Sequence, residues 1–145
     1  MQPRLNFYKA SPEAIKAMMA LEARVEASGI EKPLAELVRL RASQINGCAF
    51  CLDMHASDAL KGGEQQRRLT LLQAWRETTL FSQREQAALR WTETITRVGD
   101  THVPDEDWDA VRPHFSEQEL MDLTLLVIAI NGWNRLAIAF RKLPD

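Results

Sequence analysis

Cysteine is scarce in this chain of 145 residues, and its only two copies, Cys48 and Cys51, stand in a single C-x-x-C. One pair excludes the disulfide-dense scaffold of small secreted domains. A chain of this length buries about 68–70% of its unfolded surface, so it needs no structural disulfide to hold a core. The pair is therefore the first place to look for chemistry.

The sequence also lacks blocks of like charge and long apolar runs. Its formal net charge is −2 with 26% charged residues, so we expect neither nucleic acid nor an anionic membrane as a partner. The unbroken apolar stretch from Leu125 to Ile130 is far shorter than the ~20 residues that span a bilayer. We therefore expect a buried core or subunit-interface helix there.

The first residues, MQPRLNFYKASPEA, contain no apolar segment of the kind found in signal peptides. We therefore expect the protein in the cytoplasm, which is a reducing compartment. A C-x-x-C in such a compartment indicates a redox-active or metal-binding pair rather than a permanent staple.

Helix start and stop signals recur along the whole chain. Ser82 with Glu85, and Ser116 with Glu119, have the spacing of capping boxes. The alternation and turn dipeptides of β-hairpins are missing. We therefore expect an all-α bundle of about six to eight helices, forming one domain over residues 1–145. The predicted helices run from Pro12 to a stop at Gly29, from Pro33 to Asn46-Gly47, from about Cys48 to Gly62-Gly63, over roughly 64–75, from Ser82 to Gly99, over 104–111, and after Ser116 with a break or kink at Asn131-Gly132.

The spacing of Cys48 and Cys51 suits a disulfide that closes and reopens, provided that the segment is helical. Cα atoms three residues apart on a helix are about 5 Å apart, inside the range of roughly 4.4–6.8 Å that a disulfide tolerates. His55 follows Cys51 by four residues, and helical side chains lean toward the N-terminus, so its imidazole is directed over the Cys51 sulfur. Because Asn46-Gly47 stops the preceding helix, Cys48 begins a new one, where free N–H groups and the dipole favour a thiolate.

Glu36 belongs to the preceding predicted helix, and the turn at Asn46-Gly47 could bring it back near His55. Its carboxylate would then orient the imidazole and take part in proton transfer. Other interpretations stay open from the residues alone. Cys48, Cys51, His55 and Glu36 could together bind zinc, or the cysteines could be small buried hydrophobic residues.

Four tryptophans, Trp75, Trp91, Trp108 and Trp133, raise the question of an apolar pocket for an organic substrate. In helical proteins tryptophan mostly serves cores and interfaces, so we expect these residues there. His102 and His114 have no cysteine or acidic partner at a telling spacing, and we expect them in loops or at helix ends.

Glu36, eleven further residues, Cys48-Ala49-Phe50-Cys51 and then Leu52-Asp53-Met54-His55 resemble the signature of the alkylhydroperoxidase AhpD-like proteins in the carboxymuconolactone decarboxylase family. The core motif spans residues 36–55, and the resemblance extends to residues 34–38, 62–63, 74–77 and 88–93. It implies an all-α fold that forms homo-oligomers and reduces hydrogen peroxide or organic hydroperoxides without a prosthetic group or metal.

The resemblance also implies roles for the motif. Cys48 and Cys51 are the redox couple, with Glu36 and His55 as the proton relay: one thiolate attacks the peroxide, forms a sulfenic acid and condenses with the other cysteine, and an external dithiol carrier restores the pair. The geometry of His55 favours Cys51 as the attacking thiol, and the opposite assignment stays open. Some members have a second histidine where this chain has Phe50.

Three other functions remain as alternatives. The pair could serve a disulfide oxidoreductase that handles protein thiols, or a redox sensor without turnover. The decarboxylase branch of the family does not depend on a cysteine pair, so Cys48 and Cys51 argue against lactone chemistry.

Overall fold

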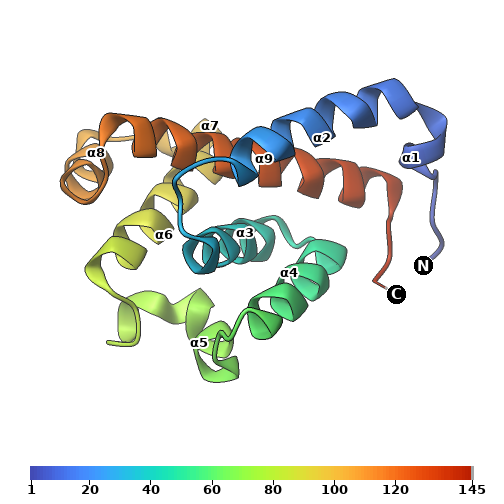
Figure 1. Cartoon of the computed structure of the whole chain (residues 1–145). Coiled ribbons are helices and arrows are strands. Elements are labelled where there is room, and N and C mark those ends of the chain that lie inside the picture. The colour runs from blue at the N-terminus through green and yellow to red at the C-terminus, as the bar shows by residue number, and fades with distance from the viewer. Residues whose placement is uncertain (145) are drawn as a thin grey trace.

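The computed structural model describes residues 1–144, and every regular element in them is a helix (Figure 1). These residues form α1 (Phe7–Ala10), α2 (Pro12–Glu26), α3 (Lys32–Asn46), α4 (Ala49–Lys61), α5 (Gln66–Leu71), α6 (Gln83–Thr96), α7 (Val98–Thr101), α8 (Asp105–Val111) and α9 (Glu117–Phe140), with 3₁₀ turns η1 (Leu72–Glu77) and η2 (Arg112–His114). The prediction of an all-α bundle is confirmed. The helices number more than the predicted six to eight because α1 and α7 are single turns of four residues.

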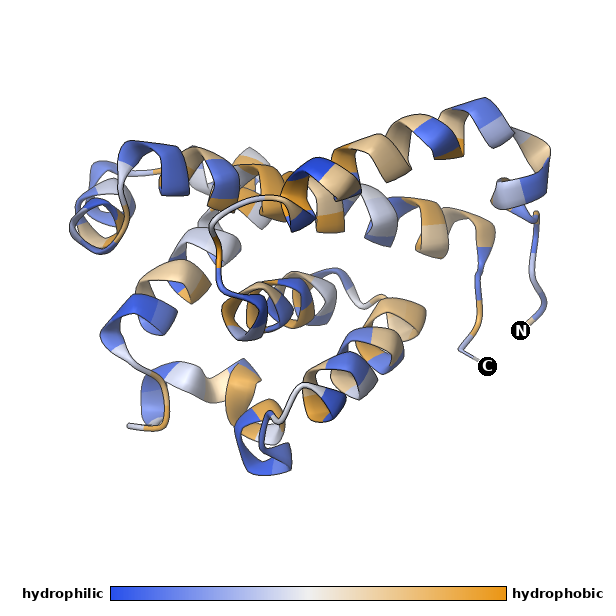
Figure 2. Ribbon diagram, viewed as in Figure 1, coloured by the Kyte–Doolittle hydropathy of each residue, from blue (hydrophilic) through white to orange (hydrophobic). Residues whose placement is uncertain are grey.

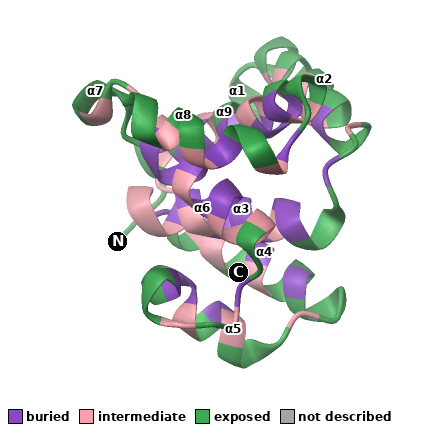
Figure 3. Cartoon of the chain, turned by 90° about the vertical axis from the view of Figure 1, so that its left-hand side faces the viewer, coloured by how far each residue is buried: buried purple, intermediate pink, exposed green. Residues whose placement is uncertain are grey.

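Helix α3 lies at the centre of the bundle, where it packs against α4, α6 and α9. Figure 1 shows α2 and α9 side by side above α3, with α4 and α5 below it. Leu37 and Val38 of α3 are fully buried, and each such side chain stabilises the fold by about 1.5–3 kcal/mol. Hydrophobic residues recur along α3 and α9 in Figure 2, and buried ones are concentrated there in Figure 3. Helices α3 and α9, which contribute residues to the same buried cluster as Cys48 and Cys51, are thus part of the core.

Both predicted capping boxes are present. The Ser82 hydroxyl accepts from the Glu85 N–H at 3.2 Å, and the Glu85 carboxylate accepts from the Ser82 N–H at 2.8 Å. Ser116 and Glu119 form the same reciprocal pair at the start of α9. Each cap satisfies helix N–H groups that would otherwise lack partners, a contribution of about 1 kcal/mol.

One expectation about helix limits is wrong, and one short helix was not predicted. The predicted helix over roughly 64–75 is divided into α5 and η1, with Ala74 outside helical geometry at φ −116°. Nothing in the apolar periodicity predicts α1, because one turn is too short to show a period. The Asn6 side chain caps α1 by accepting a hydrogen bond from the Lys9 N–H at 3.2 Å.

The predicted break at Asn131-Gly132 is also wrong, because α9 continues for 24 residues through both positions. A Cβ atom on Gly132 would lie 3.0 Å from the terminal methyl carbon of Met18. The glycine therefore leaves room for the end of the Met18 side chain of α2, and packing outweighs its cost in helix propensity. By length and composition alone α9 could cross a membrane, but it packs against α2, α3, α4 and α6 as a core helix does.

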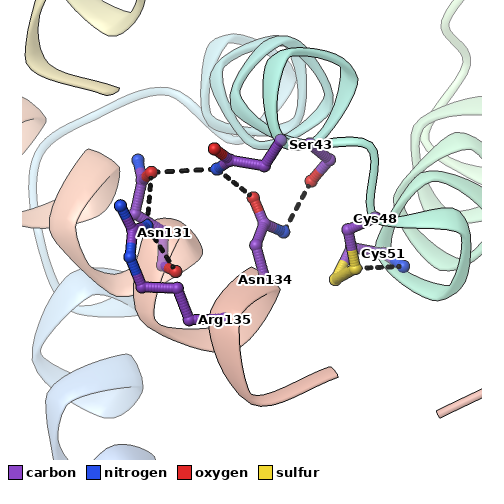
Figure 4. The surroundings of a disulfide bond; sticks show 7 residues. Ser43, Cys48, Cys51, Asn131, Asn134 and Arg135 are labelled. Carbon is purple, nitrogen blue, oxygen red and sulfur yellow. Dashed lines mark hydrogen bonds between the residues drawn. A yellow bond between two sulfur atoms is a disulfide. The ribbon is translucent and has the colours of Figure 1, made fainter. Parts of the chain in front are cut away.

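Amide side chains join α9 to the C-terminal end of α3. The Asn46 amide donates to the carboxamide oxygens of Asn131 and Asn134, each at 2.9 Å. Asn134, which is fully buried, donates to the Ser43 hydroxyl at 3.0 Å (Figure 4). Buried polar groups of this kind keep their stabilising effect only while they are paired. The polar interruption in the apolar helix is therefore a contact within the fold, next to Cys48.

Candidate redox site

The chain reverses direction between α3 and α4 at Gly47. This residue has φ +70°, in the left-handed region that glycine adopts without strain. The Cys48 N–H donates to the Ser43 carbonyl at 3.0 Å, which closes the end of α3. Helix α4 then begins with Cys48 at its N-cap, so the predicted helix start is confirmed and α4 returns alongside α3.

Cys48 and Cys51 form a disulfide, with their Cα atoms 5.4 Å apart, which agrees with the spacing expected for one helical turn. Both residues are at most 2% exposed. The Cys48 sulfur accepts from the backbone N–H of Cys51 at 3.4 Å (Figure 4). This sulfur therefore stands where helix N–H groups and the dipole favour negative charge once the bond is reduced.

Glu36 on α3 and His55 on α4 are brought together by the reversal. Their side chains meet through His55 Nδ1 and Glu36 Oε2 at 2.9 Å. Burial by itself raises the pKa of the Glu36 carboxyl, but its contacts with His55 and Arg39 outweigh burial, so this pKa lies below its ordinary value. An ionised carboxylate only accepts hydrogen bonds, so Nδ1 of His55 carries a proton in this contact.

Arg39 is the main site residue that the sequence reasoning missed. It is 5% exposed, and its guanidinium contacts Glu36 at 2.6 Å, Glu22 at 2.7 Å and Glu26 at 2.5 Å. Because an arginine stays charged in proteins, these three carboxylates surround a fixed cation. The i, i+3 spacing of Glu36 and Arg39 was the available signal, but Glu22 and Glu26 come from α2, which only the fold brings close.

A cavity of about 210 Å³, here called the front cavity, is lined by Cys51 and His55 but not by Cys48. Its other lining residues are Phe7, Tyr8, Met19, Glu22, Arg39, Phe50, Met54, Ile130, Trp133 and Ala137. Most of these side chains are apolar or aromatic, as in sites for small organic molecules. Cys51 is therefore the cysteine that borders this cavity.

Of the four tryptophans, only Trp133 lines the front cavity, and its indole N–H donates a hydrogen bond to the Glu22 carboxylate at 3.1 Å. Trp75 and Trp91 are buried in the core as expected, and Trp108 is 44% exposed. Within residues 1–144 no hydrogen bond joins His55 to either sulfur, because the ring is held through Nδ1 by Glu36. What the structure shows is that His55 and Cys51, one turn apart on α4, line the same cavity.

The profile of the carboxymuconolactone decarboxylase family matches residues 12–94. The chain belongs to this family. An uncharacterised relative, YdfG of Bacillus subtilis, is 45% identical over 139 residues, which cover 96% of this chain and 95% of YdfG. The matched segment includes the whole of the predicted core motif.

Two solved structures place the fold within this family. A protein of unknown function from Agrobacterium tumefaciens, a candidate AhpD antioxidant defence protein, is 42% identical, covers 99% of both chains and superposes with a TM-score of 0.97. The AhpD core of a peroxidase-related protein from Ralstonia eutropha is 18% identical, covers 95% of this chain and 74% of its own, and has a TM-score of 0.83, a likeness of fold alone. The resemblance to AhpD-like proteins is therefore confirmed.

Proposed function

We propose that this protein is a thiol-dependent peroxidase that reduces hydrogen peroxide or organic hydroperoxides, with Cys51 as the attacking thiol. The observation that carries the proposal is the asymmetry of the pair, because Cys51 lines the front cavity with His55 while Cys48 does not. The name of the Agrobacterium relative, which refers to antioxidant defence, supports the same class of reaction.

The oxidative half-reaction begins when His55 Nε2 takes the proton of the Cys51 thiol. The thiolate attacks one peroxide oxygen, the O–O bond breaks, and Cys51 becomes a sulfenic acid while an alkoxide leaves. The alkoxide takes a proton from His55 and departs as an alcohol. Cys48 then attacks the sulfenic sulfur, and the released hydroxide takes the Cys48 proton to give water and the disulfide.

The reductive half-reaction needs an external dithiol, which we propose as the partner. Its thiolate attacks Cys51, the sulfur that faces the cavity, and Cys48 leaves as a thiolate. The N–H of Cys51 and the start of α4 stabilise that leaving group. The second carrier thiol then displaces Cys51, so one dithiol is oxidised for each peroxide reduced.

Burial of the disulfide favours a peroxide over a protein disulfide as the oxidant. Each cysteine is at most 2% exposed, and access is through a cavity of about 210 Å³. A small hydroperoxide fits such a space, whereas the disulfide of a folded protein does not reach into it. Phe50, which stands where some family members have histidine, adds an apolar wall and no further base.

Turnover of peroxide in the presence of a dithiol tests the proposal. We expect Cys51→Ser to abolish consumption of hydrogen peroxide and of cumene hydroperoxide. Cys48→Ser is the matched control, because it retains one round of oxidation and leaves a sulfenic acid that dimedone labels at Cys51. Full turnover in Cys51→Ser, or dimedone labelling at position 48 in that variant with turnover retained, would refute the assignment.

We also propose that the protein forms homo-oligomers in the cytoplasm. The supporting feature is the outer side of α9, where Met121, Ile128 and Ile138 are 44–60% exposed. Exposed apolar side chains on one helix are typical of interfaces between subunits. Light scattering coupled to gel filtration should give a mass above 16.5 kDa, and a monomer at micromolar concentration would contradict this proposal.

A further inference from the structure

The residue that follows the end of α9 by two positions is a lysine that lies against the front cavity. The ammonium nitrogen of Lys142 is 4.3 Å from the centre of the Phe50 ring and 5.8 Å from the centre of the Tyr8 ring. Both rings line the front cavity, and aromatic faces attract a cation at such distances. The Lys142 cation is therefore held beside the wall of the space that Cys51 and His55 line.

The backbone directs Lys142 to this place. Arg141 has φ +51°, in the left-handed region, and ends α9. The turn lets the Lys142 N–H donate a hydrogen bond to the carbonyl of Ala137 at 2.9 Å, and Ala137 also lines the front cavity. The N-terminal segment is bound to the same helix end, because the Arg4 N–H donates to the Phe140 carbonyl at 3.0 Å (Figure 1). The two ends of the chain are thus joined beside the front cavity.

A second space, here called the tail cavity, adjoins the front cavity and has a volume of about 300 Å³. The two spaces share Phe7 and Tyr8 as lining residues. Lys142 is half-buried and is the only charged residue within residues 1–144 that lines the tail cavity. A molecule that occupies the front cavity can therefore extend past Tyr8 toward an ammonium group.

The charges that line the front cavity determine which way an anionic molecule would lie in it. Glu22 and Arg39 line this cavity, and Arg39 contacts three carboxylates, of which Glu22 is one. Three negative charges therefore surround one positive charge on that side, which repels an anion, whereas Lys142 attracts one. A hydroperoxide with a carboxylate is favoured with its O–O group toward Cys51 and its carboxylate toward Lys142.

We propose that Lys142 is an anion-binding subsite, and that the preferred substrate is an apolar hydroperoxide that carries a carboxylate. The inference rests on the proposed peroxidase function and narrows its substrate class. The apolar body of such a molecule lies against Tyr8, Phe50 and the other apolar residues of the front cavity. Its carboxylate accepts a hydrogen bond from the Lys142 ammonium, a contact that a neutral hydroperoxide does not make.

Two substrates that differ only in a carboxylate test the subsite, namely cumene hydroperoxide and 4-(2-hydroperoxypropan-2-yl)benzoate. In the wild type we expect kcat/KM to be about tenfold higher for the benzoate. This ratio corresponds to about 1.4 kcal/mol, close to the lower limit for a hydrogen bond to a charged group. Lys142→Met should remove the preference, Lys142→Arg should retain it, and in the wild type it should fall as the salt concentration rises.

Lys61→Met is the matched control, because Lys61 is an exposed lysine on α4 that lines neither the front cavity nor the tail cavity. The control changes the net charge by the same amount, so the preference for the benzoate should persist in it. Equal kcat/KM values in the wild type, or a preference that survives in Lys142→Met, would overturn the inference. Loss of the preference in Lys61→Met would also overturn it, because net charge alone would then explain the effect.

Binding of the two alcohol products separates failure of the subsite from failure of the proposed function. 2-Phenyl-2-propanol and 4-(2-hydroxypropan-2-yl)benzoate differ by the same carboxylate, and NMR titration of the oxidised protein measures their Kd. We expect the benzoate to bind the wild type about tenfold more tightly, and the two alcohols to bind Lys142→Met equally. Equal Kd values in the wild type would overturn the subsite, whereas tighter binding of the benzoate to a protein that reduces no peroxide would refute only the peroxidase.

Discussion

Replacing Arg39 by methionine tests whether this buried cation stabilises the cluster of carboxylates around it, which includes Glu36 of the proposed proton relay. Arg39 is 5% exposed and contacts Glu22, Glu26 and Glu36 at 2.5–2.7 Å. Removing one partner of a buried ion pair costs about 3–5 kcal/mol, because the remaining charges lose their compensation. For a domain of this size each kcal/mol corresponds to about 2–4 °C, so we expect the melting temperature at pH 7 to fall by about 6–20 °C.

The loss should depend on pH with a definite sign. The folded-state pKa of Glu36 is lowered, so its contribution to stability is present above the carboxyl pKa of the unfolded chain and disappears as the pH falls through the lower folded-state value. The difference between wild type and Arg39→Met should therefore shrink below about pH 4, where carboxyl groups become protonated.

Thermal denaturation of the oxidised protein between pH 3 and pH 8 measures this difference. Arg112→Met is the matched control, because Arg112 pairs at 2.9 Å with Asp109 in a largely exposed i, i+3 ion pair, which contributes at most about 0.5 kcal/mol. A loss of stability in Arg39→Met that is small, or that is equal at pH 3 and pH 7, would refute the reasoning.

Two further substitutions test the turn between α3 and α4, which leads into the cysteine pair. Gly47→Ala places a side chain at φ +70° with open space around it, so we expect strain alone to cost about 1–2 kcal/mol, measured by urea denaturation; an unchanged midpoint would contradict this. Asn134→Leu leaves Ser43 and Asn46 short of a partner and should cost about 1–3 kcal/mol. Because the turn between α3 and α4 positions Cys48, we also expect slower reduction of the disulfide by dithiothreitol or dihydrolipoamide in Asn134→Leu than in the wild type. Equal rates in the variant and the wild type would argue against this role.

Local signals predicted the helical framework well. The capping boxes at Ser82 and Ser116 depend on side chains three residues apart, and the turn at Gly47 depends on one residue, so these features can be read without knowing the fold. The break expected at Asn131-Gly132 is wrong for the complementary reason. A glycine next to an amide weakens a helix in isolation, but here α2 and α3 supply contacts from distant segments, which outweigh local propensity.

In the candidate site too, the features that depend on one helix or one turn were predictable from the sequence. The Cys48–Cys51 spacing and the position of His55 follow from one helix, and Glu36 follows from one turn. Arg39 was not predictable, because an arginine on an amphipathic helix is usually solvated. Its partners Glu22 and Glu26 come from α2, and no local pattern encodes that approach of α2 to Arg39. The catalytic roles of the four motif residues stay predictions.

The two sulfurs of the pair have different surroundings, and this difference gives the proposed reaction its direction. Cys51 lines the front cavity, so we expect both the peroxide and the reductant to meet it first. The Cys48 sulfur accepts a hydrogen bond from the N–H of Cys51 at the start of α4, a position that stabilises a thiolate. A sulfur that leaves as a stabilised thiolate leaves faster, so reduction should pass through a mixed disulfide on Cys51 and not on Cys48. The asymmetry begins with the first cysteine at the N-cap of α4 and the second one turn inside the helix, and residues of α1, α2, α3 and α9 complete the cavity that only Cys51 lines.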